Sequence, residues 1–150
     1  MSNPLIIRSV VPSDFAQWQP LWEGYNRFYG RDALPSEITQ MTWSRFFDAN
    51  EPVHALVAEK DGQLLGLVHY LFHRSTIQIE PTCYLEDLFS NEAARGKGIG
   101  RALIEAVYER ARIAGSPCVN WQTHESNLTA MKLYDKVADR SGFIVYGKHI

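Results

Sequence analysis

The sequence predicts an α+β fold, in which a mixed, mostly antiparallel sheet is flanked by helices. Near the middle of the chain, Asp61-Gly62 joins two runs rich in apolar residues, which is a strong signal for a hairpin of adjacent antiparallel strands. Further on, an apolar pattern with helical spacing lies between two more such runs, as in a β-α-β unit. Together these patterns give the order β-α-α-β-β-β-α-β-α-β in a single domain over residues 1–150.

The first third of the chain is predicted to form one short strand and two helical segments. The strand covers residues 5–11 and ends at Pro12, which lacks the N–H of a sheet ladder. Aromatic residues then recur three and four positions apart, as on one face of a helix; they are Phe15, Trp18, Trp22, Tyr25 and Tyr29. Pro20 and Gly24 interrupt this pattern, so we expect a kink or two short helices. A second helix opens at Pro35.

The rest of the chain alternates β-rich runs with helical patterns. The predicted strands are 53–60, 63–72, 82–89, 118–123 and 142–147. One predicted helix begins at Gly100 and is ended by Gly115 and Pro117, which favour a helix stop. A last helix is expected over residues 127–138.

Composition and charge restrict the class of protein. A hydrophobic content of 45%, with 21% charged residues and a net charge of −2, is typical of a globular protein and does not favour a nucleic-acid surface. No apolar run reaches the ~18 residues of a membrane span, and the N-terminus lacks the pattern of a signal peptide. Cys83 and Cys118 have no CxxC spacing, while His69 and His73 stand four apart in a β-rich run. We therefore expect no metal site, no membrane or nucleic-acid partner, and a cytoplasmic location.

A glycine-rich turn precedes the helix that begins at Gly100. Its glycines alternate, at Gly96, Gly98 and Gly100. Such a turn lets the backbone approach a ligand closely, and the unpaired N–H groups at the helix start attract anions. A phosphate or pyrophosphate is the natural occupant, with Arg95, Lys97 and Arg101 adding positive charge. The alternative is a flexible turn whose basic side chains are simply solvated. Neither a Walker A motif nor a dinucleotide fingerprint fits the spacing.

Two adjacent acids, Glu86 and Asp87, stand inside the otherwise apolar run CYLEDLF. Neighbouring strand residues point to opposite faces, so one of the two should face a site unless a bulge intervenes. Burial and a like-charged neighbour both raise the pKa of a carboxyl group, which is what a general base requires. We favour Glu86 as this base. The alternative is that the acids bind cations or cap backbone amides at a sheet edge.

The stretch DLFSNEAARGKGIGRALIEAV resembles the acetyl-CoA-binding signature of the GCN5-related N-acetyltransferase (GNAT) superfamily, R/Q-x-x-G-x-G/A. The matching positions are Arg95, Gly98 and Gly100. The predicted order of elements also suits the GNAT acyl-CoA N-acyltransferase fold. CYLEDLF, ESNLTAMKLYDKV and the short C-terminus are similar to the spermidine/spermine acetyltransferase branch, closest to the polyamine/histone acetyltransferase type.

This resemblance implies acetyl-CoA as co-substrate and assigns residues to it. It implies that the CoA pyrophosphate is held by Arg95, Gly96, Lys97, Gly98 and Gly100, with Arg101 adjacent. It also places the pantetheine arm against backbone groups of Leu88 and Ser90, and gives Asn127 a further CoA contact. Tyr134 corresponds to the family's tyrosine near the thioester sulfur, where it would protonate the leaving thiolate. From the residues alone, a half-buried aromatic on an amphipathic helix is the better interpretation of Tyr134; the resemblance favours the acid role.

The implied reaction is direct acetyl transfer to a primary amine in a ternary complex, with a polyamine or a lysine-like small molecule as acceptor. Glu23 and Tyr25, together with Asp87, offer carboxylates and an aromatic face that suit a cationic amine. An aromatic stripe at helical spacing is also what a buried core looks like. Acetylation of a protein lysine, such as a histone tail, and a non-catalytic acyl-CoA sensor are the alternatives. By analogy with relatives we expect a homodimer.

Overall fold

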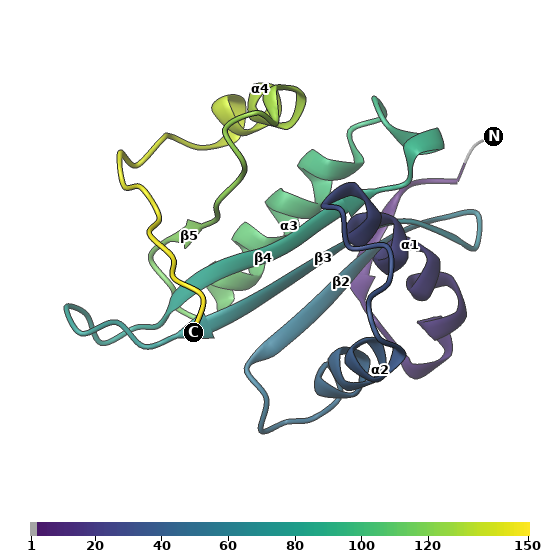
Figure 1. The fold of residues 1–150 in the computed structure, drawn as a ribbon, viewed down its shortest axis with the longest axis horizontal. Helices are drawn as coiled ribbons and strands as arrows, with labels where there is room; N and C mark the ends of the chain where they lie inside the picture. The colour runs from purple at the N-terminus through teal and green to yellow at the C-terminus, as the bar shows by residue number, and fades with distance from the viewer. Residues whose placement is uncertain (1–2) are drawn as a thin grey trace.

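The computed structural model describes residues 3–150 and contains one sheet of five strands in the order β1-β2-β3-β4-β5. The strands are β1 Ile6–Ser9, β2 Val53–Lys60, β3 Gln63–His73, β4 Thr82–Ser90 and β5 Val119–Asn120. The helices are α1 Phe15–Phe28, α2 Ser36–Arg45, α3 Ile99–Ile113 and α4 Leu128–Val137, with short 3₁₀ turns η1 Pro12–Asp14 and η2 Glu92–Ala94. This arrangement confirms the α+β prediction (Figure 1). None of the helices in the described part of the chain is long and apolar enough to cross a membrane.

The strands β1 to β4 form an antiparallel meander, and β5 joins it in parallel. The predicted hairpin between β2 and β3 is confirmed: Asp61 and Gly62 both have positive φ, 52° and 76°, as a tight two-residue turn requires. The parallel pair is short, because β4 and β5 match only at Cys83–Val119 and Tyr84–Asn120. Beyond Tyr84, β4 therefore runs on with one edge unpaired by any strand of the described chain.

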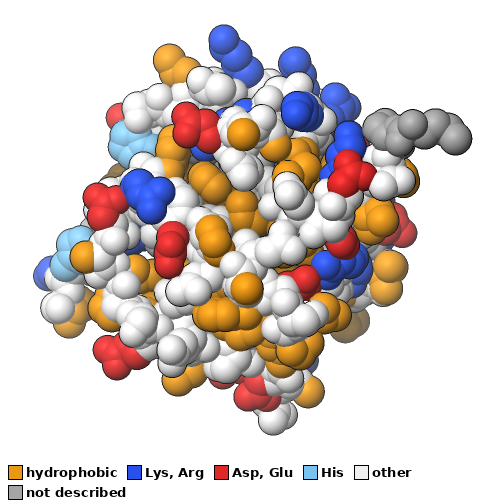
Figure 2. Space-filling view, turned by 90° about the vertical axis from the view of Figure 1, so that its right-hand side faces the viewer, with side chains coloured by type: hydrophobic (Ala, Val, Ile, Leu, Met, Phe, Trp, Pro, Cys, Tyr) orange, Lys and Arg blue, Asp and Glu red, His pale blue; other side chains and the backbone are white. Residues whose placement is uncertain are grey.

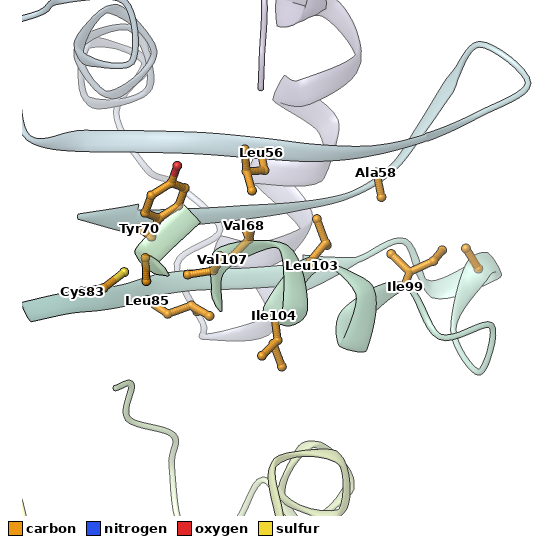
Figure 3. Close-up of a cluster of buried hydrophobic side chains, with 12 residues drawn as sticks. Leu56, Ala58, Val68, Tyr70, Cys83, Leu85, Ile99, Leu103, Ile104 and Val107 are labelled. Atoms are coloured by element: carbon orange, nitrogen blue, oxygen red, sulfur yellow. The ribbon is translucent and has the colours of Figure 1, made fainter. Parts of the chain in front are cut away.

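Helices cover the two faces of the sheet and create two separate cores. On one face, α3 packs on β2, β3 and β4, and its apolar side chains interlock with those of the strands (Figure 3). On the other face, α1 lays the aromatic stripe against β3 and β4, so that Trp18, Trp22 and Tyr25 are buried. The stripe is thus core as well as a boundary of the cleft described below. Acidic, basic and apolar side chains are interspersed on the face of the molecule shown in Figure 2.

Of the two alternatives predicted for the interruption at Pro20 and Gly24, a kink or two short helices, the second is wrong. Helix α1 is continuous, with Pro20 inside it. Pro20 is exposed, and the packing of the aromatic face outweighs the one backbone hydrogen bond that proline removes. Gly24 serves close packing instead, because a Cβ there would lie 2.8 Å from Cζ of Phe89.

The predicted final strand over residues 142–147 is also wrong, and the predicted strand over 118–123 shortens to the two residues of β5. The chain after α4 runs past β5 without regular structure (yellow in Figure 1). Its side chains are exposed, with Phe143 at 91% and Tyr146 at 90%. A run of β-forming residues becomes a strand only where another strand offers hydrogen bonds, and the short β5 offers few.

Gly66 tests how closely α3 must approach the sheet. A Cβ at this position would lie 2.9 Å from Cγ2 of Ile99 and 3.0 Å from the backbone oxygen of Phe89. We expect Gly66→Ala to lower the free energy of unfolding by about 1–3 kcal/mol through overpacking, measured by urea denaturation. Gly147→Ala is the matched control, because no atom lies within 4 Å of its added Cβ. Equal stabilities of the two variants would contradict the packing argument.

Candidate active site

A cleft of about 720 Å³ opens between α1, the end of α2 and strands β3 and β4. The side chains that bring charge or hydrogen-bonding groups to it are Tyr25, Asn26, Tyr29, Arg31, Thr42, Arg45, Glu51, His69, Tyr84, Glu86, Asp87 and Gln122. The volume suits a small molecule. Charges of both signs line the wall, so the cleft is not a simple acidic pocket.

A β-bulge brings Glu86 and Asp87 to the same cleft. His69 pairs with Asp87, but the next residue of β3, Tyr70, pairs with Leu85, so Glu86 is the extra residue of β4. In a regular strand the two acids would point to opposite faces. The bulge changes the direction of a side chain, and both carboxylates line the cleft.

The environment of Glu86 favours its protonated form. Burial by the surrounding protein raises the pKa of Glu86, and the negative charge of Asp87 raises it further. Glu86 is nevertheless exposed to solvent. A carboxylate with a raised pKa and access to the cleft can accept a proton from a bound amine.

The free edge of β4 presents backbone groups beside the acids. The N–H of Asn91 donates to the Leu65 carbonyl over 2.7 Å, which fixes the alternation of the β3–β4 ladder. By that alternation Leu88 and Ser90 point their own N–H and C=O groups away from β3, toward the unpaired edge. An extended ligand with amide groups can pair with such an edge as an added strand would.

The glycine turn has the conformation that its sequence indicates. Gly96 and Gly98 have φ of 81° and 78°, and Gly98 is the N-cap of α3 without any side-chain cap. The first N–H to bond back to this cap is that of Ala102, over 3.0 Å. The earlier amides of the turn therefore point outward without a backbone partner in the described chain, as an anion site requires.

The basic side chains of the turn differ in their contacts. Arg95 and Lys97 are exposed, and the Arg95 guanidinium lies 5.6 Å from the centre of the Phe89 ring. Arg101 instead donates to Glu105 over 3.0 Å along α3. Arg95 and Lys97 are thus the side chains most available to a phosphate, while Arg101 contributes chiefly its backbone N–H.

Helix α4 carries Asn127 and Tyr134 on the other side of the open edge. Asn127 is the N-cap of α4, and its amide donates to Thr123 Oγ1 over 3.3 Å. Tyr134 is half-buried and packs edge-on against Trp121 at 5.4 Å. Burial raises the pKa of Tyr134 to about 12, and Tyr29 of α1 adds to the shift. At neutral pH Tyr134 is therefore a phenol with a proton to donate.

Of the predicted acceptor residues, the structure brings Tyr25 and Asp87 together in the cleft but not Glu23. Burial raises the pKa of Tyr25, and the charge of Asp87 raises it further. Glu23 is exposed and does not line the cleft, because helical geometry turns position 23 away from the face that carries Trp22 and Tyr25.

Sequence reasoning missed His69 and Arg31. His69 was considered only as a metal ligand, yet it is buried and hydrogen-bonded to Trp18 and Asp87. The described chain holds no cluster of three side chains that could ligate a metal. Arg31 follows α1 and lies 5.3 Å from the centre of the Tyr29 ring. The signal that was available for His69 is its place in the period-two pattern of β3, on the same face as Leu67 and Leu71.

Comparison with known proteins identifies the family. The model of the acetyltransferase (GNAT) family matches residues 18–138. The chain belongs to this family. It is 34% identical over 151 residues to the D-amino-acid N-acetyltransferase HPA3 of Saccharomyces cerevisiae, covering 99% of this chain and 93% of that protein. It is also 30% identical to the N-acetyltransferase YhfO of Bacillus subtilis, over 93% of this chain and 94% of that protein.

The solved structure of the aminoglycoside N-acetyltransferase AAC(6')-Iy in complex with CoA has the same fold, with a TM-score of 0.84 at 16% identity. The alignment covers 99% of this chain and 96% of that one. As a member of this family, the protein is an acetyl-CoA-dependent N-acetyltransferase. The comparisons do not single out the polyamine branch that the sequence motifs resemble.

The raised pKa of Glu86 predicts the acid limb of the pH–rate profile. If Glu86 accepts the proton, kcat/KM falls as pH decreases through a pKa above the 4.5 of an ordinary glutamate, because protonation removes the base. We expect Glu86→Gln to lower kcat by about 10²–10⁴-fold and to abolish that limb, as measured by thiol release against pH. Glu109→Gln on α3, far from the cleft, is the control. An unchanged limb in Glu86→Gln assigns the base to another group.

Proposed function

We propose that this protein transfers the acetyl group of acetyl-CoA to the primary amine of a small molecule, by direct attack in a ternary complex. The observation that carries the proposal is the bulge in β4. It sets Glu86 and Asp87 in a cleft of small-molecule size, next to an open strand edge and an anion-binding turn.

The residues on the open side of β4 fit the co-substrate. We assign the pyrophosphate to the turn from Arg95 to Gly100, where positive φ values and outward amides are in place. The free edge at Leu88 and Ser90 suits the amides of the pantetheine arm. Asn127, at the start of α4, is a further contact on the far side of that edge.

The proposed chemistry follows from which groups in the site accept and which donate a proton. Acetyl-CoA supplies the acetyl group as a thioester. An alkylammonium has a pKa near ~10.4 and must lose a proton before it attacks; Glu86 takes this proton directly or through water. Backbone N–H groups at the edge of β4 stabilise the charge that develops on the carbonyl oxygen. Tyr134 donates a proton to the departing sulfur.

The charges of the cleft favour an acceptor that carries both an amine and a carboxylate. Asp87 and Arg31 act with opposite sign on the pKa values of Tyr25 and Tyr29, so both charges lie near these rings. The acids suit an ammonium group, and Arg31 suits a carboxylate. A lysine-like or other amino acid offers both groups, in keeping with the D-amino-acid substrates named for the similar yeast enzyme. A polyamine fits the acids alone and is the second candidate; a protein lysine is the third.

A panel of acceptors tests the function. We expect thiol release with one or more of D- and L-lysine, other D-amino acids, thialysine, spermidine, spermine, an aminoglycoside and a lysine peptide. Tyr134→Phe should lower kcat more than it raises KM, because the phenol acts only as sulfur departs. Binding of acetyl-CoA without turnover of any amine would favour the sensor, and turnover of the peptide alone would favour a protein substrate.

Arg31→Gln separates the two small-molecule classes. We expect it to raise KM about tenfold or more for amino acids, since a charge-assisted hydrogen bond is lost, and to leave KM for spermidine unchanged. Lys60→Gln, which removes a positive charge outside the cleft, is the control. Equal effects of Arg31→Gln on both acceptors would show that Arg31 does not bind a carboxylate of the acceptor.

We further propose that the protein forms a homodimer through its C-terminal segment and works in the cytoplasm. The exposed apolar side chains of Phe143, Ile144 and Val145 are the reason for the first proposal. The second rests on the two cysteines, Cys83 and Cys118, which are both free.

Light scattering coupled to gel filtration checks the oligomeric state. We expect the mass of two chains for the unmodified protein. We expect the mass of one chain for Val145→Asp, because this variant places a charge in the apolar contact. Ile113→Asp is the control, because Ile113 is equally exposed but lies at the end of α3. A monomeric unmodified protein would overturn the dimer.

A further inference from the structure

His69 occupies the centre of the sheet, where few polar side chains are found. His69 is 1% exposed. The centre of its ring lies 4.7 Å from the ring centre of Phe46 and 5.4 Å from that of Trp22. It is also a lining residue of the cleft. A histidine so enclosed needs hydrogen-bond partners for both ring nitrogens.

The partners of His69 determine where its proton resides. Nε2 lies 3.1 Å from Nε1 of the fully buried Trp18, and Nδ1 lies 2.8 Å from Oδ2 of Asp87. An indole N–H can only donate, so Nε2 must accept and carries no proton. The single proton is therefore on Nδ1 and is donated to the Asp87 carboxylate. A second proton on the ring would bring two N–H groups face to face.

The direction of these bonds links the core under α1 to the reacting groups. The order is Trp18 N–H to His69, and His69 N–H to Asp87. Asp87 is the sheet partner of His69 and directly follows Glu86, the extra residue of the bulge. With Oδ2 held by His69, Asp87 has Oδ1 for the cleft that both acids line.

We propose that His69, fixed by Trp18 as the Nδ1–H tautomer, is a positioning residue that orients the Asp87 carboxylate toward the ammonium group of the acceptor. Trp18 touches no substrate and acts only through His69. The inference rests on the proposed function, since it gives Asp87 the task of binding the acceptor amine.

Trp18→Phe is the decisive variant, because it keeps an aromatic ring and removes the donor to Nε2, at the cost of some buried side-chain volume that the matched variant also loses. Trp22→Phe is its match on the same helix: the Trp22 indole N–H donates to Oγ1 of Thr39 over 3.2 Å instead of to His69. Both variants lose one buried hydrogen bond, so thermal unfolding should show similar losses of stability. Only Trp18→Phe should change the state of His69.

The first readout is the tautomer, measured by ¹⁵N chemical shifts of the His69 ring in the full-length protein. We expect the Nδ1–H pattern in the unmodified protein and in Trp22→Phe. In Trp18→Phe the pattern should change, because the donor that keeps Nε2 unprotonated is gone. A proton on Nε2 in the unmodified protein would overturn the proposal, whatever the enzyme acetylates.

The second readout is kinetic and uses whichever acceptor the panel identifies. We expect Trp18→Phe to raise KM for the amine about five- to tenfold, the equivalent of one buried hydrogen bond, and to alter the acid limb of kcat/KM. KM for acetyl-CoA should not change. The charged and titratable groups that share the cleft with His69 are Tyr25, Tyr29, Arg31, Arg45, Glu51, Tyr84, Glu86 and Asp87.

The two readouts separate the possible failures. A correct tautomer with the same acceptor KM in Trp18→Phe as in the unmodified protein makes His69 merely structural and overturns the positioning role. His69→Gln should restore part of the acceptor KM lost in His69→Ala, because its amide can also donate to Asp87. No rescue, with both variants folded, counts against the role. Failure of the acceptor panel leaves the tautomer result intact and rejects the proposed function instead.

Discussion

The candidate active site depends on one irregularity in the pairing of β3 with β4. Regular pairing would put one of the two acids on the α3 side of the sheet, among apolar side chains, where a carboxylate is costly. The extra residue at Glu86 places both carboxylates on the α1 side. The same strand then leaves β5 after Tyr84, so that a free backbone edge begins within a few residues of the acids. Acid pair and edge thus come from one continuous segment and cannot move independently.

The elements that follow from local pattern were predictable, and those that depend on register were not. Asp61-Gly62 determines its own turn, and the glycines at 96 and 98 adopt the left-handed conformation that their sequence indicates. The bulge, by contrast, depends on which residue of β3 lies opposite Glu86. For the same reason the hydrogen bond between His69 and Asp87 was not predicted, because the two residues are 18 positions apart in the chain.

Tertiary contacts overrode local signals in three places. Pro20 stays inside α1 because buried aromatic side chains on the other face hold the helix against the sheet. Residues 142–147 have the composition of a strand but find no partner within the described chain. Glu23 looked suited to an amine because it neighbours Trp22 in sequence, yet the turn of the helix carries it to the solvent side. In each case a local signal was interpreted without the tertiary contacts that decide the outcome.

The residues assigned to the two substrates are also divided along the chain. The walls of the cleft come mostly from residues before Leu88, whereas the edge, the glycine turn and α4 come from residues after it. Substitutions in α1, α2 and the loop between them would therefore alter one wall of the acceptor cleft and leave the donor half untouched. Strand β4 therefore belongs to both halves: its residues up to Asp87 face the acceptor cleft, and its residues from Leu88 onward provide the edge assigned to the donor.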